Sequence, residues 1–170
     1  KSTIKDNDIE ILLRKKKLNL KAISEGSEAY KNSEFIIIAT PTNFDERNNK
    51  FDTSAVDNVI NEILRVNNHA LIVIKSTMPI GHTIQLQQKF QTKNIICSPE
   101  FLREGRALFD NEYPSRIIIG DESKQSKDFA KILLNAAKKK PKVLFLSSSA
   151  AESVKLFSNT YLALRIGFFN

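Results

Sequence analysis

The sequence predicts an α/β fold that contains a mostly parallel sheet and ends in the start of a long helix. Short apolar runs alternate along the chain with helix-like segments of about a dozen residues, which is typical of right-handed βαβ units. The runs are apolar on both faces, as strands of a covered parallel sheet should be. Three of them end in turns made of small polar residues and proline, where such sheets place a ligand crevice.

Composition limits the classes of function. The 170 residues suffice for one domain or slightly more, and 41% hydrophobic with 26% charged residues is ordinary for a globular protein. The net charge of +7 comes largely from residues 14–17 and 138–140, which lack the interleaved aromatics of single-strand binders, so we expect no nucleic-acid partner. No apolar run approaches the roughly 20 residues of a membrane span. We therefore predict a cytoplasmic protein without a membrane partner.

Cysteine usage excludes a disulfide framework, because the chain has a single cysteine, Cys97. Cys/His spacings typical of metal sites are absent, and His69 and His82 stand apart from each other, so no metal is predicted. Cys97 lies in an apolar strand-like run, where a small side chain packs well, and we do not expect it to be a nucleophile.

Periodicity assigns the elements of the first half in order. A weak helical pattern covers 8–13 and is ended by the basic run, and alternation of apolar and polar residues predicts a half-buried strand over 18–24. The expected elements that follow are a short helix over 27–31, a central strand over 34–40, a polar loop over 43–50 and a helix begun by Thr53 or Ser54 that carries apolar residues from 56 to 64.

The second half repeats the alternation of strand and helix. The expected elements are strands over 70–74, 95–97, 116–120 and 143–146, a helix through 84–90, a helix around 129–133 and a long helix from about 150 to the end. That final helix-like run stops at Asn170 without a capping signal, and the chain starts at Lys1 without methionine. We expect the chain to be a piece of a longer protein.

The stretch Ser98–Gly105 carries the densest polar chemistry. Pro99 should stop the preceding strand, and Glu100 and Glu104 would share one face if the segment formed a helical turn. With Arg103 between them, these carboxylates suit acid/base work or recognition of sugar hydroxyls. The alternative is a solvated loop with an internal Glu–Arg pair.

Two further groups of residues are candidates. Threonines 40, 42 and 77 follow strands that should end at one edge of the sheet, where their hydroxyls can bind a ligand or cap the next helix. Lys155 and Asn159 lie four residues apart on one face of the last helix. They can polarise a carbonyl or hold a sugar oxygen, or Lys155 can be a solvated lysine on an amphipathic helix.

No G-x-G-x-x-G fingerprint occurs among the five glycines, so the phosphate loop of a first dinucleotide-binding unit is not in this sequence. The ordered motifs nevertheless carry a clear resemblance. They are Ala-Thr-Pro-Thr (39–42), Lys-Ser-Thr-Met-Pro-Ile-Gly (75–81), Ser-Pro-Glu-Phe-Leu-Arg-Glu-Gly (98–105), Tyr-Pro-Ser-Arg (113–116) and Lys-Leu-Phe-Ser-Asn-Thr-Tyr (155–161). Along its whole length the chain resembles the UDP-glucose 6-dehydrogenases within the UDP-glucose/GDP-mannose dehydrogenase family.

The resemblance implies a Rossmann-like fold and NAD-dependent oxidation of UDP-glucose to UDP-glucuronate. The resemblance also implies that the two hydride transfers pass through a covalent thiohemiacetal and a thioester. It implies that Thr42 lies against NAD, that Thr77 lies near NAD and orients a catalytic water, and that Glu100 is the acid/base residue of thioester hydrolysis. Glu104 would lie near the nicotinamide. Lys155 and Asn159 would stabilise negative charge on the C6 oxygen. The substrate-binding set is Glu100, Phe101, Leu102, Arg103, Glu104, Lys155 and Asn159.

The resemblance also implies a division of the chain. Residues 1–149 would be the later part of the NAD-binding domain and 150–170 the start of a central helix through which family members form homodimers. The first βαβ unit and the C-terminal UDP-binding domain, with its nucleophilic cysteine, would lie outside the chain, which we expect to be inactive alone. The alternatives are a GDP-mannose 6-dehydrogenase, whose motifs match less closely, and a non-catalytic remnant of the fold.

Overall fold

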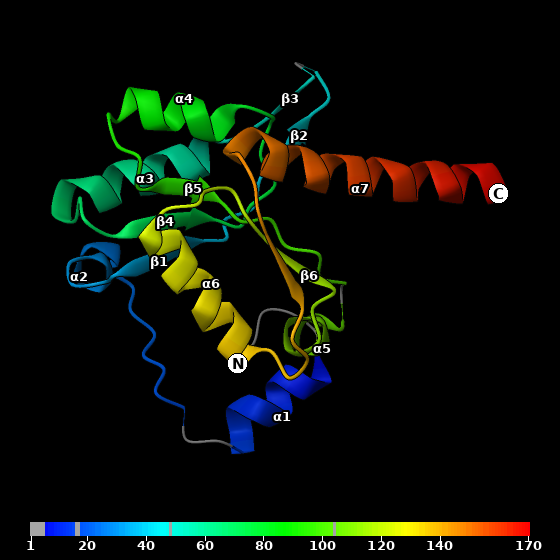
Figure 1. The fold of residues 1–170 in the computed structure, drawn as a ribbon, viewed down its shortest axis with the longest axis horizontal. Helices are drawn as coiled ribbons and strands as arrows, with labels where there is room; N and C mark the ends of the chain where they lie inside the picture. The colour runs from blue at the N-terminus through cyan, green and yellow to red at the C-terminus, as the bar shows by residue number, and fades with distance from the viewer. Residues whose placement is uncertain (1–5, 16–17, 48, 104) are drawn as a thin grey trace.

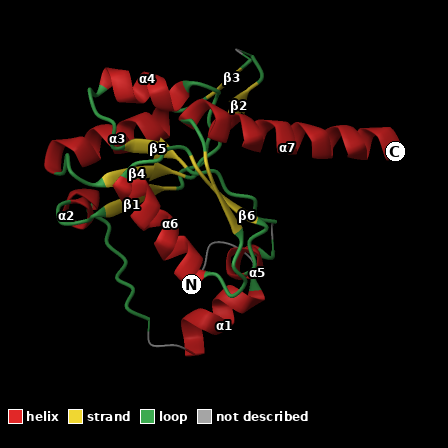
Figure 2. Ribbon diagram, in the orientation of Figure 1, coloured by secondary structure: helices red, strands yellow, loops and turns green. Residues whose placement is uncertain are grey.

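The computed structural model describes residues 6–15, 18–47, 49–103 and 105–170. The helices are α1 (Asn7–Lys15), α2 (Gly26–Tyr30), α3 (Ser54–Val66), α4 (His82–Lys89), α5 (Ala107–Glu112), α6 (Lys124–Ala136) and α7 (Ser148–Phe169). The strands are β1 (Phe35–Ile38), β2 (Phe44–Asp45), β3 (Lys50–Phe51), β4 (Leu71–Ile74), β5 (Ile95–Cys97), β6 (Arg116–Ile119) and β7 (Lys142–Phe145). Figure 1 shows their arrangement, and Figure 2 separates helices from strands by colour.

The principal strands are parallel. β1, β4 and β5 lie side by side in that order, with Ile36 opposite Ile72 and Ile72 opposite Ile95. β6 and β7 form a second parallel pair. The two groups meet where β5 and β6 end, because the Gly120 amide donates to the Cys97 carbonyl over 2.8 Å. The predicted mostly parallel α/β fold is confirmed.

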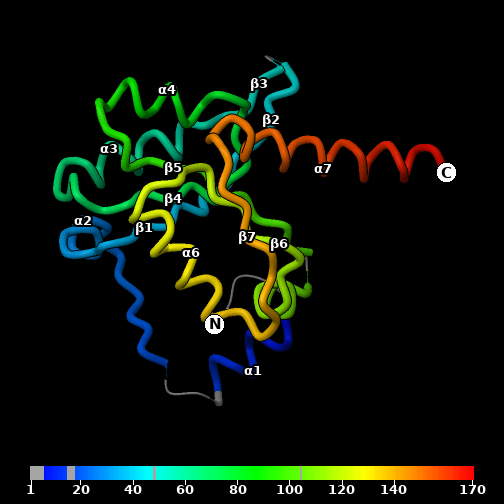
Figure 3. The backbone as a smooth tube through the Cα atoms, in the orientation of Figure 1, coloured from blue at the N-terminus to red at the C-terminus, as the bar shows by residue number. Residues whose placement is uncertain are grey.

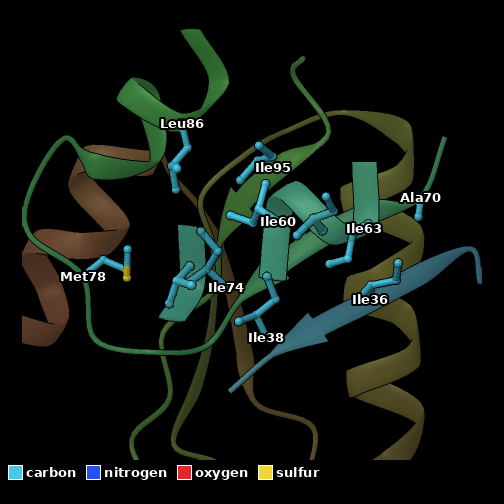
Figure 4. Packing of buried hydrophobic residues seen from close by; sticks show 11 residues of the cluster. Ile36, Ile38, Ile60, Ile63, Ala70, Ile74, Met78, Leu86 and Ile95 are labelled. Carbon is cyan, nitrogen blue, oxygen red and sulfur yellow. The ribbon is translucent and has the colours of Figure 1, made fainter. Parts of the chain in front are cut away.

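Helices cover the two faces of the β1–β4–β5 sheet. On one face, Ile60 and Ile63 of α3 and Leu86 of α4 point toward the strands, and each is at most 1% exposed (Figure 4). On the other face α6 packs Phe129 against the sheet, with its ring 5.7 Å from that of Phe35. Because successive strand residues point to opposite faces, fully apolar strands such as Leu71–Ile74 supply both cores.

One edge of strand β1 has no partner among the described strands. The strand pairs only with β4 among the described strands, and Ile37 is 53% exposed although Ile36 and Ile38 are buried. The missing partner leaves one edge of β1 uncovered, and the exposed Ile37 shows that helices do not fully cover one face of this strand.

α7 has a docked start and a projecting remainder. Its first turn lies against the ends of β5 and β6, and the rest extends away from the body of the molecule (Figures 1 and 3). Within the described residues, no helix has the length and apolar character needed to cross a membrane.

Most predicted elements are present, and one is wrong. Residues 18–24 are not a strand: they are extended, exposed and irregular, and pair with no described strand. Alternation gives a strand only where a neighbour supplies the ladder hydrogen bonds. The loop predicted over 43–50 contains the β2–β3 hairpin, and α5 was not predicted. Residues 16–17, in the basic run expected to end α1, lie outside the described part of the chain.

Candidate active site

Three strand ends converge at one edge of the sheet, as predicted from the turn sequences. The turns after β1 and β4 are joined by side chains: Ser76 Oγ donates to the Thr40 carbonyl over 2.6 Å, and Thr42 Oγ1 donates to the Thr77 carbonyl over 2.9 Å. The Thr42 hydroxyl thus fixes the turn that carries Thr77. Both threonines are only part-buried, so they line the edge rather than the core.

The loop after β5 leaves the sheet as irregular chain. Ser98 is fully buried, and its Oγ donates to the Ile118 carbonyl over 2.8 Å, which holds the loop on β6. Residues 98–103 form no helical turn. Glu104 lies outside the described residues, so its predicted place beside Glu100 remains a prediction.

Arg103 forms an ion pair that joins the loop to α5. Its guanidinium donates to Asp110 of α5 through two bonds of 2.6 and 3.1 Å, and its backbone amide adds a third of 2.8 Å. The Arg103 side chain holds the pKa of Asp110 down, at about 2. Since 60% of the Arg103 side chain is exposed, the pair orders the loop more than it adds stability.

Lys155 faces the loop. Its Nζ donates to the Glu100 carbonyl over 2.7 Å and lies 5.5 Å from the centre of the Phe101 ring. Arg116 of β6 stacks on the same ring at 4.3 Å, so two cations hold Phe101. Lys155 is therefore not the solvated lysine that its helix position alone would allow. Asn159, one turn further on, is exposed.

A cavity of about 500 Å³ adjoins this loop. It is lined by the loop residues 99–103 together with α5, β6 and the end of α6, and Lys75 reaches it from the end of β4. Lys75 Nζ lies 3.4 Å from Ser98 Oγ. Burial lowers the pKa of this lysine, against the opposing attraction of Glu100. The cavity combines an apolar lining with a few charged groups, which is typical of a small-molecule site.

Cys97 is packed into the core. It is 1% exposed, and burial raises the pKa of its thiol to about 12. A thiol so buried is neither accessible nor ionised near neutral pH, in agreement with the expectation that it is not a nucleophile.

Three residues at this edge had no predicted role. Lys75 and Arg116 lie inside recognised motifs, so the sequence contained a signal for them. Glu152 lies three residues before Lys155, which places both on one side of α7. Among the described residues no cluster of three or more His, Cys, Asp or Glu side chains is arranged to hold a metal ion.

Comparison with known proteins identifies the family. Residues 1–138 match the model of the UDP-glucose/GDP-mannose dehydrogenase family, NAD binding domain. The chain is 52% identical over 171 residues to a UDP-glucose 6-dehydrogenase of Campylobacter jejuni and 49% identical over 177 residues to one of Streptococcus pneumoniae. Both matches cover all of this chain but only 44% and 45% of the relatives, so the chain spans less than half their length.

Solved structures agree with the fold. A UDP-glucose dehydrogenase from Pyrobaculum islandicum is 29% identical, with a TM-score of 0.75 over 86% of this chain and 36% of its own. A GDP-mannose dehydrogenase from Pseudomonas aeruginosa superimposes with a TM-score of 0.84 over 99% of this chain and 42% of its own. At 22% identity, the second likeness is one of fold alone.

Proposed function

Because the chain belongs to the UDP-glucose/GDP-mannose dehydrogenase family through its NAD-binding domain, we propose that it supplies part of the active site of an NAD-dependent UDP-glucose 6-dehydrogenase. The reaction oxidises the C6 alcohol of the sugar to a carboxylate through two hydride transfers and yields UDP-glucuronate. The identities of 49–52% to enzymes of that name support this choice of substrate.

One observation carries the proposal most strongly. The ammonium group of Lys155 lies on the Glu100 carbonyl at 2.7 Å, although the two residues come from elements 55 positions apart. The same sheet edge carries the turn with Thr77. The contact of Lys155 with Glu100, and the position of Thr77 at the same edge, support a site where an open α/β sheet binds ligands.

The residues present fit the reacting end of a dinucleotide. Thr42 and Thr77 are both part-buried and lie in adjacent turns at the carboxyl ends of β1 and β4, the edge at which open α/β sheets bind dinucleotides. In this proposal Thr42, Thr77 and Glu104 hold NAD, which when bound accepts hydride from the sugar carbon.

Lys155 and Asn159 are proposed to stabilise the C6 oxygen while it bears negative charge. A positioned ammonium group and an amide donor lower the energy of an oxyanion when water is excluded. Substrate entry would release Lys155 Nζ from the Glu100 carbonyl and turn it toward the sugar oxygen. We propose that the segment from Glu100 to Glu104 binds the sugar.

Thr77 and Glu100 are proposed to serve the hydrolytic step. The Thr77 hydroxyl would orient the attacking water, and the Glu100 carboxylate would accept its proton. The covalent aldehyde stage requires a thiolate, and the buried thiol of Cys97 does not suit it. The thiol in this proposal therefore comes from outside these 170 residues.

The division of the chain supports the same assignment. We propose that residues 1–149 are the later part of the NAD-binding domain and that 150–170 begin a central helix. The uncovered edge of β1 is consistent with a further βαβ unit, and the exposed apolar residues of α7 with a homodimer formed along that helix. A reduced, lone cysteine is consistent with the cytoplasm as the compartment.

The test uses the product of the complete open reading frame that encodes this chain. Incubated with NAD and UDP-glucose, it should release two NADH per sugar oxidised, measured by absorbance. Activity with GDP-mannose and none with UDP-glucose would move the assignment to the sister enzyme. A folded protein that releases no NADH from either sugar would support the alternative of a non-catalytic remnant.

Substitutions then assign the roles. Lys155→Ala should lower kcat by about 100-fold or more, the usual cost of removing one oxyanion donor. Lys131→Ala is the matched control, because Lys131 pairs with Asp128 on the far helix α6. Glu100→Gln should slow hydrolysis more than the first hydride transfer, so that a burst of NADH precedes slow turnover.

A further inference from the structure

A buried carboxylate joins α7 to α4. Glu152 is 1% exposed, and its side chain accepts three hydrogen bonds from the start of α4: from the Gly81 amide over 2.6 Å, from the Thr83 amide over 2.8 Å and from Thr83 Oγ1 over 2.6 Å. Such charge-assisted bonds are about twice as strong as neutral ones. A burial that would otherwise be costly is thereby compensated.

α4 has no cap from its own sequence. The residue before it, Gly81, has a left-handed backbone with φ of 89° and lacks a side chain that could bind the free amides of the first turn. Glu152, about 70 residues further along the chain, acts as the cap by accepting hydrogen bonds from these amides. Its carboxylate faces the positive end of the α4 dipole. The amides of Gly81 and Thr83 thus find their acceptor on α7.

Glu152 joins the two segments that carry Lys155 and Thr77, which are proposed catalytic groups. Lys155 follows it by three residues on the same side of α7. The turn 75–81, which carries Thr77, runs directly into the two amides that Glu152 binds. Whatever fixes Glu152 on α4 therefore fixes Lys155 relative to Thr77.

The first turns of α7, around Glu152, are closely packed against the end of β6, so that this part of the helix has little room to move. Ser148 Oγ donates to the Gly120 carbonyl over 2.8 Å, and Ala151 is fully buried. A Cβ atom on Gly120 would lie 2.7 Å from the Cys97 carbonyl and 3.1 Å from Ser148 Cα. α7 is thus tightly packed against β6, and the Glu152 bonds join it to the end of the turn after β4.

We propose that Glu152 is a positioning residue that sets Lys155 against Thr77 and the loop of Glu100. The proposal rests on the proposed function and adds to it a residue that does not touch the substrate. The carboxylate is required because its two oxygens only accept, and all three partners donate. A glutamine would turn an NH2 group toward an N–H donor.

The first measurement needs no activity. In the protein produced from the complete open reading frame, Lys155 should be protected from amine acylation by acetic anhydride because its Nζ is bound to the Glu100 carbonyl. Glu152→Gln should raise the labelling of Lys155, read by mass spectrometry, by about threefold or more and leave Lys131 unchanged. Unchanged labelling of Lys155 in that variant would overturn the proposal whatever the protein catalyses.

The second measurement is a double-mutant cycle on NADH formation from UDP-glucose. Glu152→Gln should lower kcat by about 10- to 100-fold, since misplacing a catalytic group by about 1 Å costs rate on this scale. In the Lys155→Ala background the same change should cost less than about threefold, because the group that Glu152 positions is gone. Multiplicative effects, or a kcat that Glu152→Gln leaves unchanged, would show that Glu152 is only a helix cap.

Control variants separate the loss of the Glu152 contacts from other causes of a change in labelling or rate. Glu62→Gln removes an exposed carboxylate from α3 and should change neither labelling nor rate. If Glu152→Gln fails to fold, Thr83→Val removes only the 2.6 Å hydroxyl bond and should show the same changes at smaller size. A wild-type protein without activity, in which Glu152→Gln still exposes Lys155, would refute the proposed function and retain the positioning role.

Discussion

The two ends of α7 differ in burial: small and polar residues at its start are buried, whereas large apolar residues at its end are exposed. In its first turns Ser148, Ala151 and Glu152 are buried against α4, β5 and β6. From Phe157 onward the large apolar residues are exposed, and Phe168 reaches 84%. One continuous helix is thus part of the domain core at its start and an uncovered apolar surface at its end.

The difference shows that hydrophobicity alone does not place a helix. The docked end is held by small residues and polar bonds, whereas the large apolar side chains of the other end are exposed. Close approach to β6 depends on the missing Cβ of Gly120 and on the small side chain of Ala151. The chemistry proposed for Lys155 belongs to the docked end, where the geometry is fixed.

The largest effect is expected where docking is tightest. Gly120→Ala would place a Cβ 2.7 Å from a backbone carbonyl, which cannot move cheaply. We expect the free energy of unfolding to fall by about 2–3 kcal/mol, measured by urea titration. Gly167→Ala is the matched control: a Cβ there meets nothing within 4 Å, so this helix substitution should be neutral or stabilising. Equal losses at both glycines would contradict the contrast between the two ends.

A smaller loss is expected when one docking bond is removed. Ser148→Ala deletes the 2.8 Å bond to the Gly120 carbonyl in a buried place and should lower the free energy of unfolding by about 1 kcal/mol. Ser153→Ala serves for comparison. Its hydroxyl bonds back to Ser149 within the same helix, and its loss should have almost no effect in the same titration.

Arg116 tests where the docked end stops. Its guanidinium stacks on Phe101 and lies 3.5 Å from Ser158 Oγ, near the middle of α7. We expect Arg116→Met to cost about 0.5–1 kcal/mol of the free energy of unfolding. Arg165→Met removes a more distant cation, 5.8 Å from an exposed Tyr161 ring, and should cost less. The reverse order would place the boundary further along the helix.

The exposed end should contribute least to the stability of the monomer. Leu164→Ser combined with Phe168→Ser should change the free energy of unfolding by no more than about 0.5 kcal/mol per site at low protein concentration. If the homodimer forms along α7, the same double variant should shift sedimentation toward the monomer. A large loss of stability in a protein shown to be monomeric would mean that these residues pack within their own chain.

The sequence determined most of the strands and helices, because the spacing of apolar residues that predicts such an element lies within the element itself. Continuous apolar runs such as Leu71–Ile74 predict strands covered on both faces, and the structure has them there. Residues 18–24 show the limit: their alternation predicts a strand, but a strand also needs a partner, which sequence pattern does not reveal. The motifs around Glu100 and Lys155 likewise indicated the kind of chemistry and the family, but not which residues are in contact.

Tertiary structure alone decided the contacts at the sheet edge. That Lys155 lies on the Glu100 carbonyl, and that Glu152 caps a helix about 70 residues away, depends on how α7 docks beside α4. The burial of Glu152 has no signature in a helical pattern, because two of its three partners are backbone amides, which any sequence provides, and the third is a hydroxyl about 70 residues away. The chain therefore specifies its strands and helices by local pattern, while the arrangement of its proposed catalytic groups arises only when distant elements pack together.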